Sequence, residues 1–307
     1  MNINNINSIL KPRHNHINKY TINISNDQGE IHETDIYYPF LDKLNIEKLP
    51  IVLFLQGALV DKSDYSNYAN ILSKYGFIVV IPNRKRFIPE VNMEGLFGDV
   101  GIIDDILKHL KNIEKDDYNS PINKIIDTSK LVLAGHSWGG SVGLSAINNV
   151  FMPILYINDF QKPDELKAAV FFETTLPKLD KNFQPTENFI SINNKNISIA
   201  ILESSLNQEN SKARRKTYDS IKNGDKIFIT IQGTNHYGIT NEDNIERRKV
   251  VPFLEQKIAT ETIARWSALF LRATVLDDKS AKEYIFKIDN ISDTNVIVKD
   301  FSIKKLD

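Results

Sequence analysis

The stretch that decides the fold is LVLAGHSWGG, residues 131–140. Its first four residues are apolar, which is typical of a buried strand, and the small residues at 141–150 predict a helix after it. Between them, residues 135–139 fit the pattern G-x-S-x-G, which places a serine on a sharp turn from strand to helix. The two glycines remove side chains that would collide with neighbouring backbone. We therefore expect Ser137 to act as a nucleophile; the simpler alternative is a glycine-rich turn whose serine only caps the helix.

Along the rest of the chain, apolar runs that predict strands alternate with segments that predict helices. Runs typical of strands buried on both faces of a parallel sheet occupy residues 51–55, 77–81, 130–134, 167–172, 197–202 and 226–231. The segments at residues 65–75, 100–113, 211–221 and 251–271 are predicted to be helices. This order predicts an α/β fold with a mostly parallel central sheet and helices on both faces.

Other segments predict a hairpin, loops and insertions. Two extended runs flank the turn sequence NDQG at 26–29 and predict an N-terminal antiparallel hairpin. We expect a polar arm at residues 1–19 and a single domain at 20–307. The remaining expectations are hairpin strands at 20–25 and 31–38, loops at 84–97 and 178–196, insertions near 151–166 and 178–196, and a last extended segment at 284–288.

Composition limits the class of protein. The 307 residues are 41% hydrophobic and 25% charged, which is ordinary for a soluble globular chain. The absence of cysteine excludes disulfides and thiolate chemistry, and a net charge of −1 indicates no nucleic-acid partner. No apolar run approaches the roughly 20 residues of a membrane span. Because residues 1–20 lack the apolar core of a signal peptide, we expect a cytoplasmic protein, with secretion left open in case a leader has been removed.

Four chemically active residues each follow a predicted strand. They are Ser137, Glu173, Glu203 and His236. Because ligands of parallel sheets lie beyond the carboxyl ends of the strands, we expect these side chains to converge on one edge. A serine needs a base within hydrogen-bond reach, and the base needs an orienting carboxylate. His236 is the only histidine after Ser137, so it is the expected base.

The acid has two candidates in the sequence. Glu173 follows the first apolar strand after the helix predicted at 141–150, and Glu203 follows the second. Many hydrolases carry an aspartate a few residues beyond the second of these strands, a position that falls near Asn207, which holds no charge. We favour Glu173 and keep Glu203 as the alternative.

An oxyanion hole requires two N–H donors. One is expected from the backbone of Trp138, and the other from Ala58 in the loop after residues 51–55. Trp138 also places an aromatic wall beside the nucleophile, or serves only for packing. The residues expected to contact substrate are Gln56, Gly57, Phe97, Trp138 and Tyr237.

Five segments carry a resemblance to a known family. They are PIVLFLQG at 50–57, SKYGFIVVIP at 73–82, AGHSWGG at 134–140, AVFFE at 169–173 and ITIQGTNH at 229–236. With them, the chain resembles α/β-hydrolases, in the branch that holds chlorophyllases, plasma-type platelet-activating factor acetylhydrolases and cutinase-like polyester hydrolases. The resemblance runs from about residue 51 to residue 266. The resemblance implies that the acid directly follows the first strand after the helix predicted at 141–150. The residue at that position is Glu173.

The chain departs from the pattern of this branch at two positions. The family usually has histidine where this chain has Gln56, in the loop that carries the second oxyanion donor. The family's acid is usually aspartate, and here it is glutamate.

These observations predict a serine hydrolase of a small-molecule carboxylic ester with a hydrophobic group. The expected reaction uses a Ser-His-Glu triad and an acyl-enzyme, and it requires no cofactor and no metal. The alternatives are a non-catalytic binding protein on a hydrolase scaffold, and an amide hydrolase, lactone hydrolase or acyltransferase with the same triad. The sequence leaves the oligomeric state open.

Overall fold

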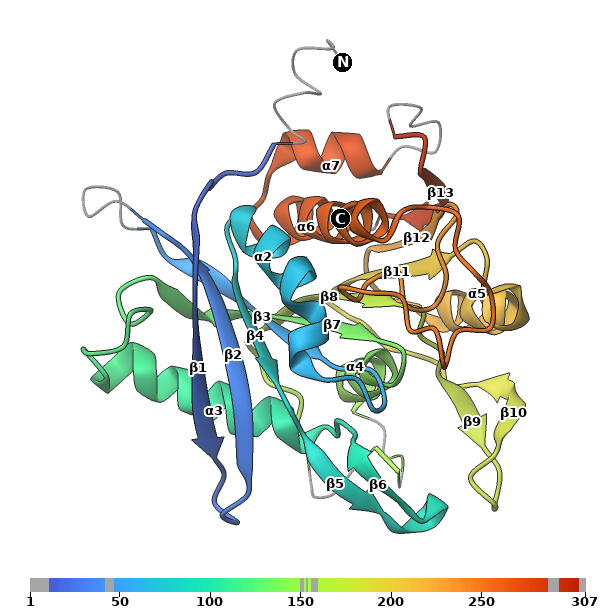
Figure 1. Ribbon diagram of the computed structural model, residues 1–307, viewed down its shortest axis with the longest axis horizontal. Coiled ribbons are helices and arrows are strands. Elements are labelled where there is room, and N and C mark those ends of the chain that lie inside the picture. The colour runs from blue at the N-terminus through green and yellow to red at the C-terminus, as the bar shows by residue number, and fades with distance from the viewer. Residues whose placement is uncertain are drawn as a thin grey trace.

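A nine-stranded sheet organises the part of the chain that the structure describes (Figure 1). The computed structural model describes residues 11–41, 47–149, 152, 154–155, 160–286 and 293–303. The strand order is β1-β2-β4-β3-β7-β8-β11-β12-β13. The expected mostly parallel sheet and its N-terminal hairpin are confirmed. Three stretches lie outside the described residues: residues 1–10 of the expected arm, residue 150 at the end of the helix expected at 141–150, and residues 151, 153 and 156–159 of the expected insertion.

The central strands run parallel and the edge strands antiparallel. The parallel strands are β3 (Leu49–Leu55), β4 (Ile78–Pro82), β7 (Ile126–His136), β8 (Leu166–Phe172), β11 (Ser198–Ser204) and β12 (Lys226–Ile231). The antiparallel strands are β1 (Ile17–Ser25) and β2 (Ile31–Pro39) at one edge and β13 (Val296–Ser302) at the other. Two hairpins stand apart from the sheet: β5 (Lys85–Ile88) with β6 (Met93–Leu96), and β9 (Pro177–Leu179) with β10 (Pro185–Phe189).

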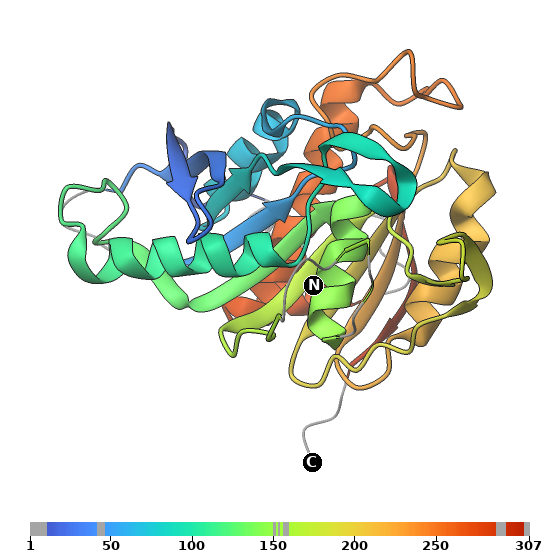
Figure 2. The same ribbon diagram turned by 90° about the horizontal axis from the view of Figure 1, so that it is seen from below.

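Helices cover both faces of the sheet, as expected (Figures 1 and 2). One face carries α2 (Ser66–Lys74) and α6 (Gln256–Val275), with α7 (Lys279–Ile285) packed on α6. The other face carries α3 (Gly101–Asp116), α4 (Trp138–Asn148) and α5 (Ser211–Ser220). Short 3₁₀ turns complete the chain at η1 (Lys62–Tyr65), η2 (Pro89–Val91) and η3 (Gln208–Asn210).

The side chains of β3 are apolar on both sides of the sheet, as an interior strand requires. All seven of its residues are buried. Val52 and Phe54 pack into the core under α2 and α6, whereas Ile51, Leu53 and Leu55 pack into the core under α3 and α4. A strand that is apolar on both sides is stable only between two layers of helices.

Among the described residues, no helix is both long and apolar enough to cross a membrane.

The C-terminal expectation was wrong. An extended segment was expected at 284–288, but residues 279–285 form α7, and residues 287–288 lie outside the described residues. The reason is visible in the spacing: Ala281, Tyr284 and Ile285 are buried at helical intervals, and the Asp278 side chain accepts a hydrogen bond from the N–H of Ala281. The last strand is β13 instead, which lies at the sheet edge beside β12.

Other segments also differ from expectation. The segments expected as loops at 84–97 and 178–196 contain the hairpins β5–β6 and β9–β10. The first strand begins at Ile17, within the expected arm. Just before it, the N–H groups of Arg13 and His14 donate to the carbonyl of Lys74, both at 2.9 Å, so this part of the arm is attached to the end of α2.

Candidate active site

Ser137 sits on a strained turn between β7 and α4. Its backbone has φ 52° and ψ −114°, a left-handed conformation that non-glycine residues rarely adopt. The flanking glycines are required by close packing, because a Cβ on Gly139 would overlap the carbonyl oxygen of Leu55, and one on Gly135 would lie 2.8 Å from the carbonyl carbon of Gly139. The half-buried Ser137 therefore has the backbone geometry of a nucleophile elbow.

The sheet brings Glu173 to His236. Glu173 follows β8, and His236 lies in the loop after β12. Oε2 of the buried Glu173 is 3.1 Å from Nδ1 of His236. An ionised carboxylate only accepts hydrogen bonds, so Nδ1 carries the proton and Nε2 is left with its lone pair. This tautomer is the one that a general base requires.

Hydrogen bonds keep Glu173 ionised despite its burial. Burial alone would raise its pKa, but the hydrogen bond from His236 and the charge of Arg214 lower the pKa of Glu173 to about 2. Oε1 accepts from the N–H and hydroxyl of Ser204 at 2.7 and 2.9 Å. Oε2 also accepts from Nη1 of Arg214 at 3.2 Å and from the Asn207 amide. Thus Asn207, which cannot itself be the acid, donates to the glutamate beside it.

Glu203, the alternative acid, has different partners. Its Oε1 accepts from the Thr230 hydroxyl at 2.9 Å, and its Oε2 accepts from Nε of Arg214 at 3.0 Å and from the Ser211 hydroxyl at 3.2 Å. The structure therefore brings Glu173, and not Glu203, into contact with His236.

Arg214 is a fully buried residue that sequence reasoning missed. Its guanidinium contacts both Glu173 and Glu203, and it donates to the carbonyl of Asn207 at 2.6 Å. Two carboxylates around one guanidinium leave the cluster with one negative charge. Arg214 holds the Glu173 carboxylate in place beside His236. The available signal was weak: the helix sequence is polar throughout, and its buried positions are Arg214, Thr217, Tyr218 and Ser220.

A second network, also missed, joins three loops of the site through His136. Burial holds the pKa of His136 well below its usual value, so the ring is neutral. The carbonyl of His236, which only accepts, lies 2.8 Å from Nε2 of His136, so this nitrogen carries the proton. Nδ1 must then accept from the Tyr65 hydroxyl at 3.0 Å, and the Tyr65 oxygen accepts from the N–H of Gly57 at 2.9 Å.

This chain of hydrogen bonds places the His236 loop relative to Ser137. His136 precedes Ser137, and the His136 and His236 rings lie 4.7 Å apart between centroids. Among the hydrogen bonds of the described residues, none joins the Ser137 hydroxyl directly to His236. Such bonds are often long in the absence of substrate and shorten when it binds.

The loop after β3 is fixed by its own polar groups. The side-chain amide of Gln56 donates to the carbonyl of Val60 at 3.1 Å and accepts from the N–H of Arg84 at 3.3 Å. Gln56 and Gly57 are buried, whereas Ala58 is half-buried. Gln56 therefore fixes the loop after β3, which contains Ala58 and is expected to carry the second oxyanion donor. We call this segment the oxyanion loop. On the other side, Trp138 is the first residue of α4, so its N–H has no acceptor within the helix.

Trp138 has both a packing role and an open face. Its Nε1 donates to the carbonyl of Gly98 at 2.7 Å, and its ring meets Phe97 edge-on at 5.5 Å. Phe97 is buried, while Trp138 remains half-buried beside Ser137.

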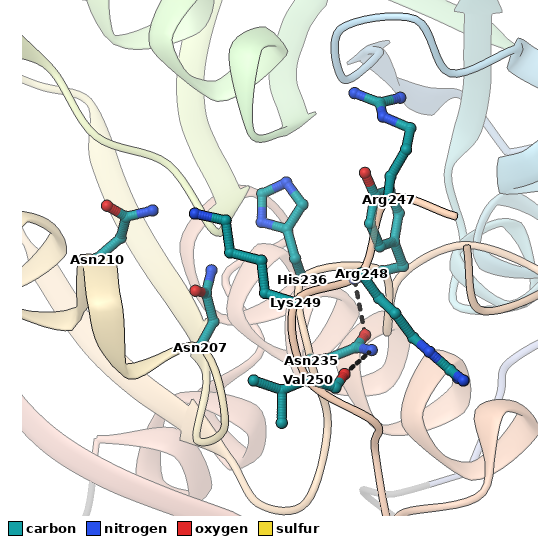
Figure 3. A pocket seen from close by; sticks show the side chains of 9 residues that line it. Asn207, Asn210, Asn235, His236, Arg247, Arg248, Lys249 and Val250 are labelled. Atoms are coloured by element: carbon teal, nitrogen blue, oxygen red, sulfur yellow. Dashed lines mark hydrogen bonds between the residues drawn. The ribbon is translucent and has the colours of Figure 1, made fainter. Parts of the chain in front are cut away.

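A cavity of about 240 Å³ opens beside His236 (Figure 3). It is lined by Asn207, Asn210, Asn235, His236, Tyr237, Arg247, Arg248, Lys249 and Val250. Asn235 joins the loop after β12 to the cavity-lining segment 247–250. Its side-chain amide donates to the Val250 carbonyl at 2.9 Å and accepts from the N–H of Tyr237 at 2.9 Å. Of the residues expected to contact substrate, Tyr237 lines this cavity.

Comparison with known families agrees with this architecture. Residues 43–152 match the family model described as Chlorophyllase, a stretch that extends from the approach to β3 through α4 and includes Ser137. The fold is an α/β-hydrolase, and the chain resembles chlorophyllases. It is therefore a hydrolase of the α/β-hydrolase type. The match ends before Glu173 and His236, and no curated protein matches the chain.

Proposed function

We propose that this hydrolase cleaves carboxylic esters through Ser137, His236 and Glu173. Nε2 of His236 takes the proton of the Ser137 hydroxyl while Oγ attacks the ester carbonyl. The N–H groups of Ala58 and Trp138 hold the resulting oxyanion, an arrangement in which one donor contributes about 10²- to 10³-fold in rate. His236 returns the proton to the leaving alcohol. A water molecule, deprotonated by His236, then hydrolyses the acyl-enzyme and frees Ser137.

The observation that carries the proposal is the contact between Glu173 and His236 beside the strained Ser137. Oε2 of the buried Glu173 lies 3.1 Å from the His236 imidazole, and Ser137 has a strained backbone with positive φ. Backbone strain and buried charged groups with shifted pKa values both cluster at functional sites. The combination at one sheet edge supports catalysis over a non-catalytic binding protein. Gln56, which replaces the histidine usual in the family, supports the loop after β3 through its two hydrogen bonds. Amide or lactone hydrolysis and acyl transfer would use the same groups.

A hydrophobic group of the ester is proposed to lie on the Trp138 side of the nucleophile. Leu59, which is 44% exposed, is joined to the β5–β6 hairpin by a 2.8 Å hydrogen bond from its N–H to the carbonyl of Leu96. Phe87 and Met93 of that hairpin are also exposed. This apolar rim supports a small-molecule ester whose acyl or alcohol part is hydrophobic, and the mechanism needs no cofactor.

Hydrolysis of 4-nitrophenyl acetate and butyrate tests the proposal. Ser137→Ala and His236→Ala should each lower kcat by at least about 10³-fold, because nucleophile and base act as one unit. Ser129→Ala, an exposed serine at the far end of β7, serves as the matched control and should retain activity. Unchanged hydrolysis by Ser137→Ala would exclude the proposed mechanism.

A further inference from the structure

The cavity beside His236 has an unusual charge for a site expected to bind a hydrophobic ester. Its lining residues include three cations, Arg247, Arg248 and Lys249, and none of the described lining residues is acidic. Three asparagines complete the polar wall. In the view of Figure 3, the His236 ring lies between the side chains of Lys249 and Arg247.

Two of the cations are paired with carboxylates outside the lining. Arg248 forms an ion pair with Asp243, which also accepts from the Asn235 amide at 2.9 Å, so Arg248 helps to hold the loop. Lys249 pairs with Glu209, and both side chains are about two-thirds exposed. An ion pair this exposed contributes little, so Lys249 can exchange Glu209 for another anion.

Arg247 is held by neutral groups. Its Nη1 lies 3.1 Å from the carbonyl oxygen of Ala58 and 3.4 Å from that of Leu59, and its guanidinium lies 5.8 Å from the centre of the Tyr237 ring. Among the described residues, no carboxylate forms an ion pair with it. A guanidinium offers five N–H donors in a planar fork that matches a carboxylate, and the two carbonyls occupy only one of its nitrogens.

We propose that this cavity binds a carboxylate of the substrate, so that the ester cleaved at Ser137 carries a negative charge on its acyl or its alcohol part. The inference rests on the proposed ester hydrolysis. Arg247 and Lys249 supply the charge, and the asparagine amides supply further donors. Because the cavity adjoins His236, a carboxylate held there fixes the reacting ester relative to the imidazole. Binding energy from a group that does not react thereby orients the group that does.

Two matched substrate pairs distinguish the acyl part from the alcohol part. For the alcohol part, 4-acetoxybenzoate is compared with its neutral methyl ester. For the acyl part, 4-nitrophenyl hemisuccinate is compared with 4-nitrophenyl butyrate. In each pair, the ratio of kcat/KM for the anionic ester to that for the neutral ester is measured for the wild type, Arg247→Met, Lys249→Met and the double variant. Taking ratios within one variant cancels any general effect of Arg247 on the oxyanion loop.

The proposal predicts that the double variant lowers this ratio ten- to a hundred-fold in at least one pair, the range of charge-assisted hydrogen bonds. Lys249→Met alone, an exposed position, should lower it in the same pair. Lys115→Met, which removes an exposed charge from the end of α3, should leave the ratios unchanged. If the ratio of the double variant differs from that of the wild type by less than about two-fold in both substrate pairs, the anion site is overturned. If the neutral esters are then still cleaved in a Ser137-dependent reaction, the proposed function stands without it; if no ester is cleaved, both fail.

Discussion

Glu173 and Glu203 end neighbouring strands and share Arg214, yet only Glu173 contacts His236. Glu173→Gln should lower kcat by about 10³- to 10⁴-fold, because an amide carries no charge and can present an N–H to Nδ1, which selects the wrong imidazole tautomer. Glu203→Gln should lower kcat by less than about ten-fold. Steady-state hydrolysis of 4-nitrophenyl butyrate compares the two variants. An equal or greater loss in Glu203→Gln would transfer the acid role to Glu203.

The low pKa of Glu173 also predicts how stability depends on pH. Its folded pKa of about 2 lies below the ordinary value of 4.5, so ionised Glu173 stabilises the fold above about pH 4.5. This contribution, on the order of 3 kcal/mol, is lost as the pH falls from about 4.5 through about 2. Urea unfolding from pH 6 to pH 2.5 measures it. The free energy of unfolding should fall more steeply in the wild type than in Glu173→Gln, which lacks the titrating group; parallel curves would contradict the assignment.

The residues that carry the proposed chemistry were found because each has a local signal. Ser137 lies in a short motif, His236 is the only histidine that follows it, and Glu173 ends an apolar run. Arg214 has no comparable signal, since a basic helix sequence is normally a solvated face. Its burial follows from α5 packing above two strand-end carboxylates that are 30 residues apart in the chain.

The loops of the site are connected through Tyr65, at the end of η1. Tyr65→Phe removes the hydroxyl between Gly57 and His136, leaving a buried N–H and a buried ring nitrogen without partners. Each unsatisfied group costs about 1–3 kcal/mol. We expect kcat for the acetate ester to fall about ten-fold with little change in KM, because the oxyanion loop and His236 lose their common support.

Tyr68→Phe is the matched control for Tyr65→Phe. Tyr68 is equally buried and its ring packs on Phe54 at 5.2 Å, against 4.5 Å for Tyr65, but it lies outside the hydrogen-bond chain to His136. It should change the midpoint of thermal unfolding and leave kcat unchanged. If both variants reduce kcat in proportion to their loss of stability, Tyr65 has a structural role only.

The strands and helices that carry a pattern of apolar residues could be predicted from the sequence. The short strands that are recognised only by their hydrogen-bonded partner could not. The parallel strands read as continuous apolar runs because both faces are covered. The β5 and β6 strands have four residues each and half of these residues are exposed, so neither an apolar run nor a regular alternation marks them. Their pairing follows from the surrounding backbone, such as the bond between the N–H of Phe97 and the carbonyl of Arg84.

At the scale of the whole molecule, the order of strands assembles the site. The chain leaves β7, β8 and β12 at the same edge of the sheet and there presents Ser137, Glu173 and His236, which are spread over 100 residues of sequence. The sequence indicated this convergence because parallel strands end at a common edge. It did not indicate the cationic cavity, since Arg247 and Lys249 belong to a loop whose position depends on Asn235 and on contacts with the oxyanion loop.

Labelling with a fluorophosphonate, followed by peptide mapping, tests the central claim most directly. Only a serine activated by a base reacts rapidly, so the folded chain should gain one adduct, located on Ser137. The adduct should be absent in Ser137→Ala and form far more slowly in Glu173→Gln. It should also be absent in the urea-unfolded chain, because the activation depends on the assembled sheet. A folded wild-type chain that remains unmodified, or that is modified at another residue, would contradict the claim that Ser137 is the nucleophile of this hydrolase.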